Sequence, residues 1–137
     1  MTALRYLIPL FIGLVLLFSA CAGNQENKLI GVWTITRMDA LPGEFPITVW
    51  EFTSDNDLLK RRVTEVSDSL ITTGRWGITK KNRLSLSKFD VGFNGEWEIV
   101  TLSTDVLRIV LKVFVTDSNG GGERPAGQVL VEASKTR

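Results

Sequence analysis

Apolar and polar side chains alternate along almost the whole chain after residue 28, and turn residues break this alternation at short intervals. In the segment GVWTITRM, Trp33 and Ile35 alternate with threonines, which is the pattern of a strand with one buried face. Asn56 suits a turn because asparagine tolerates the left-handed conformation, and Asn94-Gly95 is typical of a two-residue hairpin turn. Eight short strands at this spacing predict an all-β fold, an antiparallel barrel or sandwich. The candidates are residues 31–38, 47–53, 58–66, 70–78, 83–89, 96–102, 106–115 and 128–134.

The triplet Gly31-Val32-Trp33, which opens the first strand candidate, resembles the G-x-W signature of lipocalins. More closely, the ordered segments NKLIGVWTI, FTSDNDLL, GRWGITKKNRLSLS and EWEIVTLSTDVLRIVL resemble the short lipocalin-like domains of bacterial lipoproteins. The resemblance implies a small antiparallel up-and-down β-barrel of about eight strands over residues 29–137. It also implies that Trp33 closes one end of that barrel.

The first twenty residues have the pattern of a secretory signal peptide. Arg5 is the only charged residue among them, and an apolar run follows it from residue 6 to residue 18. This run is shorter than the roughly 20 residues of a membrane-spanning helix and fits the apolar core of a signal peptide. The alternative, an uncleaved anchor helix, is disfavoured by this length. We therefore predict a lipoprotein signal peptide over residues 1–20.

Cys21, the only cysteine of the chain, follows the apolar run directly. The sequence Ser19-Ala20-Cys21 resembles the lipobox of bacterial lipoproteins, with Phe18 where leucine is commonest. The resemblance implies cleavage before Cys21 and a lipid on its thiol. Two or more acyl chains hold a protein firmly on a membrane. Residues 21–28 are then the lipidated cysteine and a polar tether, for which we expect an extended conformation.

The interior of an eight-stranded barrel is just wide enough to be filled by side chains or to hold one small ligand. Strand alternation places the four tryptophans of the chain on inward positions. They can line an apolar pocket for a small hydrophobic ligand, or they can form the core itself, and both alternatives stay open. The candidate ligand-binding residues are Trp33, Trp50, Phe52, Arg61, Trp76, Trp97 and Ile109.

Arg61 is the polar member of this set. If Leu59 and Val63 point inward, Arg61 does so too, and its planar guanidinium suits a ligand carboxylate. The simpler alternative is an edge strand on which Arg61 is solvated or paired with Glu65, because a buried unpaired charge is costly. Phe93, in the loop segment FDVGFNG, is a candidate lid residue at the mouth of the barrel.

The sequence offers little for catalysis. It contains no histidine, which is the usual general base and the commonest metal ligand. It shows no glycine-rich phosphate loop and no carboxylate cluster with calcium-loop spacing. We therefore expect no enzyme activity, no cofactor and no metal. Loss of Arg5 with the signal peptide leaves 15 basic against 15 acidic residues, and this balance argues against nucleic acid as a partner.

Two functions remain open at this point. The first is a lipid-anchored lipocalin-like protein of the bacterial cell envelope that binds a small hydrophobic ligand. The second is a filled-barrel lipoprotein module that has no small ligand and acts by protein–protein interaction in the envelope. In both, the protein meets the membrane through the lipid on Cys21. We expect it on the outer membrane with its domain on the periplasmic face.

Overall fold

The computed structural model describes residues 23–38, 48–90, 92–115, 123–125 and 129–136. The predicted signal peptide and the predicted lipidation site at Cys21 lie outside these residues. Within them, a short helix over residues 23–29 is followed by strands only. The strands are β1 (Gly31–Met38), β2 (Thr48–Phe52), β3 (Asp57–Val63), β4 (Asp68–Lys80), β5 (Arg83–Ser87), β6 (Gly95–Leu102), β7 (Val106–Val115), β8 (Glu123–Pro125) and β9 (Leu130–Lys135).

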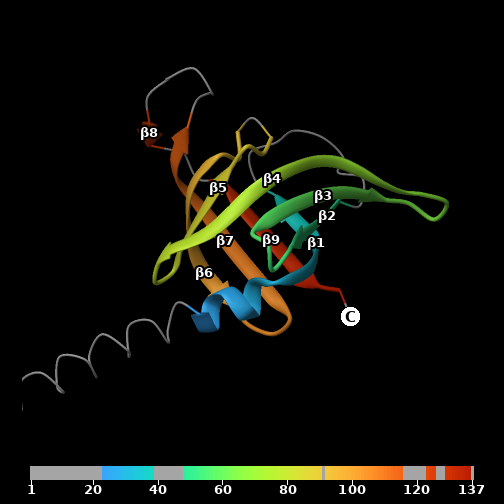
Figure 1. Ribbon diagram of the computed structural model, residues 1–137, viewed down its shortest axis with the longest axis horizontal. Helices are drawn as coiled ribbons and strands as arrows, with labels where there is room; N and C mark the ends of the chain where they lie inside the picture. Colours follow the sequence, from blue (N-terminus) through green and yellow to red (C-terminus); the bar gives the residue numbers. More distant parts are fainter. Residues whose placement is uncertain (1–22, 39–47, 91, 116–122, 126–128, 137) are drawn as a thin grey trace, which may run out of the picture.

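The predicted all-β class is confirmed, and the strands pair in one antiparallel sheet. Its order is β6-β5-β4-β3-β2-β1-β9-β7-β8, and β6 also pairs with β7. All strands except β8 therefore form a closed ring of hydrogen-bonded neighbours, which we call the closed sheet (Figure 1). The short strand β8 pairs with the last residues of β7 outside this ring. Because the connections run from each strand to its neighbour, the closed sheet has the expected up-and-down order.

Of the two turns expected from asparagine, the structure confirms one and contradicts the other. Asn56 has a φ of 65°, so the predicted left-handed turn between β2 and β3 is confirmed. The predicted two-residue hairpin at Asn94-Gly95 is wrong, because Gly95 already belongs to β6 and a longer loop precedes it. Asn94 instead braces that loop: its Oδ1 accepts from the backbone N–H of Phe89 at 2.7 Å, and its Nδ2 donates to the Phe89 carbonyl at 3.0 Å.

The segment expected as an extended tether is helical over residues 23–29 and is docked against the closed sheet (Figure 1). Gln25 exchanges two hydrogen bonds with Asn82 in the β4–β5 turn, and Leu29 is completely buried. The Lys135 ammonium donates to the Lys28 carbonyl at 3.1 Å. These tertiary contacts hold a helix that is too short to be stable alone, which explains why the sequence shows no helical period here.

One continuous apolar core fills the closed sheet between this helix and the loop that joins β5 to β6. The two lie at opposite ends of β5, and we call them the helix end and the loop end (Figure 1). The core is drawn from the helix, the strands and that loop, so a fragment of residues 23–137 keeps all of it. A domain of this size buries enough surface to fold by itself.

The helix over residues 23–29 falls short of the length and apolar character that crossing a membrane requires, and the described residues contain no other candidate.

Candidate functional site

The structure brings six of the seven candidate ligand-binding residues into the core. Each of the six is at most 5 % exposed, and all belong to one packed cluster. Side chains from β1, β2, β4, β6 and β7 therefore meet across the interior. The six are Trp33, Trp50, Phe52, Trp76, Trp97 and Ile109.

Arg61 is the exception: of the two positions considered for it, the inward one is not found, and the ion-paired one is found with partners other than Glu65. Arg61 pairs across the sheet with Val49, whereas the inward Trp50 pairs with Lys60. The Arg61 guanidinium lies on the outer face, 3.1 Å from Glu51 and 3.5 Å from Asp68, and not with Glu65. By this register Leu58, Lys60 and Arg62 of β3 share the face of Trp50; Leu58 is buried, Lys60 is partly buried and Arg62 is exposed.

The helix end is closed by Trp33, which is completely buried. Its Nε1 donates to the Leu29 carbonyl at 2.7 Å, and the Lys135 ammonium lies over its ring, 5.2 Å from the centroid. Gly31 fits this crowded end because its φ is 139° and a Cβ atom there would lie 2.6 Å from Cε of Lys135. Fixed backbone and strand residues thus seal this end.

The loop end is closed by part of the β5–β6 connection, residues 88–90 and 92–94, which we call the capping loop. Phe89 and Phe93 of the capping loop are buried and lie edge-on to the Trp50 ring, with centroids 5.2 and 5.8 Å away. Phe93 also stacks on Trp97 at 6.3 Å. The predicted lid position of Phe93 therefore coincides with an aromatic plug supplied by a connection rather than by a strand.

The capping loop can pack this deeply because Gly74 of β4 lies beneath it. A Cβ atom at Gly74 would lie 2.9 Å from both Cβ of Phe89 and the Ser87 carbonyl oxygen. Such a distance is too short for any residue larger than glycine without a shift of the backbone. Close approach at Gly74 thus positions Phe89 against Trp50.

Trp50 differs from the other tryptophans in the hydrogen bonding of its indole N–H group. Trp33, Trp76 and Trp97 donate to the carbonyls of Leu29, Thr53 and Phe93 at 2.7, 3.2 and 2.9 Å. Trp50 is only 1 % exposed, and its Nε1 has no hydrogen-bond acceptor among the described residues. Buried donors are almost always paired, so an exception needs an explanation.

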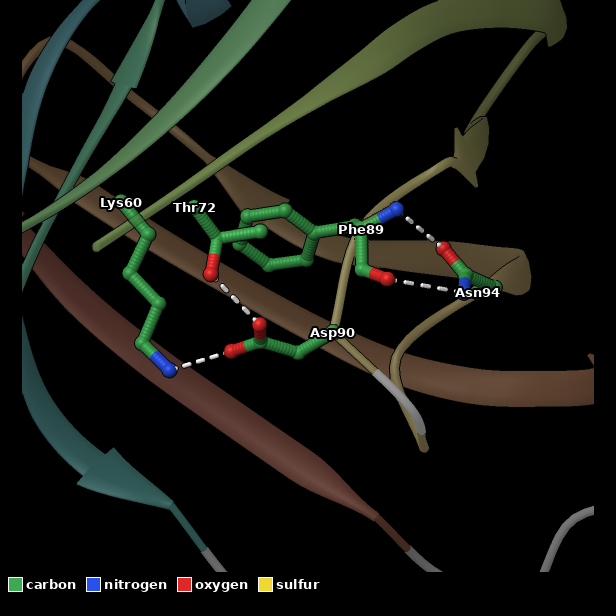
Figure 2. A network of polar contacts seen from close by, with 5 residues as sticks. All are labelled: Lys60, Thr72, Phe89, Asp90 and Asn94. Carbon is green, nitrogen blue, oxygen red and sulfur yellow. Dashed lines mark hydrogen bonds and ion pairs between the residues drawn. The ribbon is translucent and has the colours of Figure 1, made fainter. Parts of the chain in front are cut away.

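A small polar network joins β3 and β4 to the capping loop (Figure 2). Lys60 lies directly opposite Trp50 on β3, and its ammonium forms an ion pair with the Asp90 carboxylate of the capping loop. Thr72 of β4 donates to the other Asp90 oxygen at 2.7 Å. Both oxygens of this carboxylate are therefore held by groups from neighbouring strands.

Two opposing effects act on the pKa of Asp90. Burial raises it, but the hydrogen bonds from Lys60 and Thr72 and the positive charge of Lys60 outweigh burial and leave the pKa lowered. Asp90 is thus ionised at neutral pH, and the capping loop carries a carboxylate into the loop end. Lys60 and Asp90 were not among the residues predicted for the site. The alternation of Trp50 with Phe52 fixes the face on which Lys60 lies only once the register of β2 and β3 is known.

The outer face carries a shallow groove of about 230 Å³, lined mainly by Thr79, Ser85, Ser87 and Glu96. Its hydroxyl groups and single carboxylate form no recognisable catalytic arrangement. Among the described residues, no three potential metal ligands come together.

Comparison with known proteins adds no family assignment. No protein-family model matches the chain, and no curated protein matches it.

Proposed function

We propose that this chain is a lipid-anchored lipocalin-like protein of the bacterial cell envelope that binds one small amphiphile at its loop end. The observation that carries the proposal is the buried Nε1 of Trp50, which has no acceptor among the described residues. Leaving such a donor without an acceptor costs about 1–3 kcal/mol. A ligand with an acceptor group beside Trp50 would remove this cost.

The proposal also accounts for the way in which the two ends differ. At the helix end, Trp33 is satisfied by the backbone and packed beneath a docked helix. At the loop end, the space over Trp50 is taken by Phe89 and Phe93, which belong to a connection between strands. A connection can move without breaking the ring of strands, so a ligand enters by displacing the capping loop.

Support for the envelope location comes from the sequence. Cys21 follows an apolar segment of signal-peptide length and stands at the cysteine position of a lipobox-like sequence. Anchoring at Cys21 would hold the domain near a membrane, which is the source of amphiphiles. We propose no enzymatic step for the protein.

Native mass spectrometry of the fragment of residues 23–137, prepared without detergent, tests the proposal together with a tryptophan emission titration. We expect a co-purifying or added amphiphile at one molecule per chain, and an emission change that saturates. The fragment should also gain thermal stability, because a ligand that binds only the folded state stabilises it by mass action. A clean apo mass and a flat titration with anionic, neutral and cationic amphiphiles would overturn the proposal.

The second function, interaction with another envelope protein, is favoured by a different observation. The β3–β4 hairpin projects beyond the closed sheet (Figure 1) and exposes apolar side chains. Val66 is 94 % exposed, Leu70 60 % and Ile71 43 %. Chemical cross-linking in intact cells tests this function: a partner captured by the wild type should be lost in Leu70→Ser, and a partner that remains would place the contact elsewhere.

A further inference from the structure

We propose that the ligand of the loop end is an amphiphile with a carboxylate head group, and that the capping loop occupies its place in the described structure. This inference rests on the proposed function and names the chemical class of its ligand. In the described structure, Asp90 takes the place of the head group beside Lys60. Phe89 and Phe93 take the place of the apolar part of the ligand beside Trp50.

The position of Lys60 on the inner face supports a carboxylate ligand. Residues directly opposite each other on paired strands share one face of a sheet. Lys60 lies opposite Trp50 on one side and opposite Thr72 on the other, and Leu58, two residues earlier, is completely buried. The Lys60 side chain therefore starts from the inner face and is partly buried, with 23 % of its surface exposed.

The ion-pair partner of Lys60 also supports this ligand class. Ion pairs such as Arg108–Glu132 and Lys112–Glu98 join neighbouring strands on the outer face. Lys60 instead pairs with a carboxylate from a connecting loop. A charge on the inner face needs a counter-ion, and this one comes from the segment that must move if a ligand enters. A carboxylate on the ligand replaces Asp90 without leaving Lys60 unpaired.

Asp90 does not accept a hydrogen bond from the indole N–H of Trp50. The two Asp90 oxygens are taken by Lys60 and Thr72, while Nε1 of Trp50 finds no acceptor in the part of the chain that the structure describes. A free carboxylate is not tied to the backbone of the capping loop. Because Lys60 and Trp50 lie opposite each other on paired strands, we expect this carboxylate to reach both donors. This extra donor gives an external carboxylate an advantage over the internal one.

A pair of photoreactive probes tests the inference: a medium-chain alkyl carboxylate and the alcohol of the same chain. The full chain is reconstituted in nanodiscs of a zwitterionic phospholipid, and saturable labelling of the protein by each probe is titrated. Partition of the probes into the disc is the same for every variant. The affinity ratio of carboxylate to alcohol, normalised to wild type, therefore reports on the protein, and loss of folded protein cancels in it.

Four variants make the test specific. Lys60→Met should lower the carboxylate-to-alcohol ratio about 10- to 100-fold, the range that a hydrogen bond between charged groups supports. Lys60→Arg keeps the charge and should keep the ratio within a few fold. Lys88→Met is the matched control, because Lys88 is an exposed cation of the same loop, and it should leave the ratio unchanged. Asp90→Asn removes the internal competitor and should strengthen the labelling by both probes.

The outcomes separate the two levels of the proposal. If wild type labels saturably with both probes but Lys60→Met and Lys88→Met give the same ratio, the carboxylate inference is wrong and the binding function stands. If neither probe labels wild type or Asp90→Asn saturably, the binding function itself is wrong. Weaker carboxylate labelling in Asp90→Asn would overturn the competitor role of the capping loop.

Discussion

Three of the four buried tryptophans, Trp33, Trp50 and Trp97, should differ in the stability that is lost when each is replaced by phenylalanine. All three are at most 1 % exposed, so the loss of ring volume and apolar contact is common to the three changes. Trp33→Phe also leaves the Leu29 carbonyl without its 2.7 Å donor, and Trp97→Phe leaves the Phe93 carbonyl without its 2.9 Å donor. Trp50→Phe removes an indole N–H that has no acceptor among the described residues, so it leaves no described carbonyl without a donor.

The expected difference follows from the cost of a buried, unpaired polar group, which is about 1–3 kcal/mol. Trp33→Phe and Trp97→Phe should therefore be less stable than Trp50→Phe by roughly this amount. With a urea m value of about 1–3 kcal/mol per molar, a difference of 2 kcal/mol moves the unfolding midpoint by about 1 M. Urea unfolding of the fragment of residues 23–137, followed by far-UV circular dichroism, measures this shift.

Equal midpoints for the three variants would refute the reasoning. They would mean that Nε1 of Trp50 contributes as much to the folded state as the two paired indoles, and the proposed ligand site would lose its main support. Complete truncation provides the scale: Trp33→Ala should cost roughly 3–5 kcal/mol as a large core deletion.

Three further predictions follow from other parts of the molecule. Ionised Asp90, whose pKa is lowered, stabilises the fold above its unfolded-state pKa of 3.8 and loses this effect as the pH falls through the lowered value. The stability gap between wild type and Asp90→Asn in urea should therefore be largest near neutral pH and narrow as the pH falls below 3.8; a constant gap would contradict it. Gly74→Ala should destabilise the fragment by about 1–3 kcal/mol through overpacking against Phe89 and the Ser87 carbonyl, whereas Gly77→Ala, with no atom within 4 Å, should not; equal thermal midpoints would be the opposite result. Cys21→Ser should abolish labelling by radioactive palmitate in cells and release the protein from the membrane fraction; retention of the label would rule out Cys21 as the anchor.

The strands could be predicted because apolar and polar residues alternate in almost every strand that has one buried face. GVWTITRM and VLRIVLKVFV have the same bounds in the structure as in the sequence-based prediction. In the segment LLKRRV, by contrast, apolar residues occupy both phases of the alternation. A shift of one residue moves every side chain to the other face. This ambiguity made an inward Arg61 one of two alternatives, and the pairing of Trp50 with Lys60 shows that Lys60 lies on the inner face instead.

The capping loop could not be predicted because its conformation is set by tertiary contacts. Asn94-Gly95 has strong local turn chemistry, but burial of Phe89 and Phe93 against Trp50 competes with it and the longer loop forms. The sequence separates Asp90 from Lys60 by thirty positions, and only the closed sheet brings them together. The helix over residues 23–29 could not be predicted for a similar reason: the hydrogen bonds of Gln25 to Asn82 and the burial of Leu29 in the core stabilise it.

The most direct test of the ligand site is a two-dimensional ¹H–¹⁵N spectrum of the four indole N–H groups, assigned with the Trp→Phe variants. On titration of the fragment with an alkyl carboxylate, the Trp50 signal should move downfield as Nε1 gains an acceptor. The Trp97 signal should also change, because its acceptor is the Phe93 carbonyl of the displaced capping loop. The Trp33 and Trp76 signals, whose acceptors lie outside the capping loop, should stay in place. A Trp50 signal that does not move at a saturating concentration of the carboxylate would contradict the proposed site.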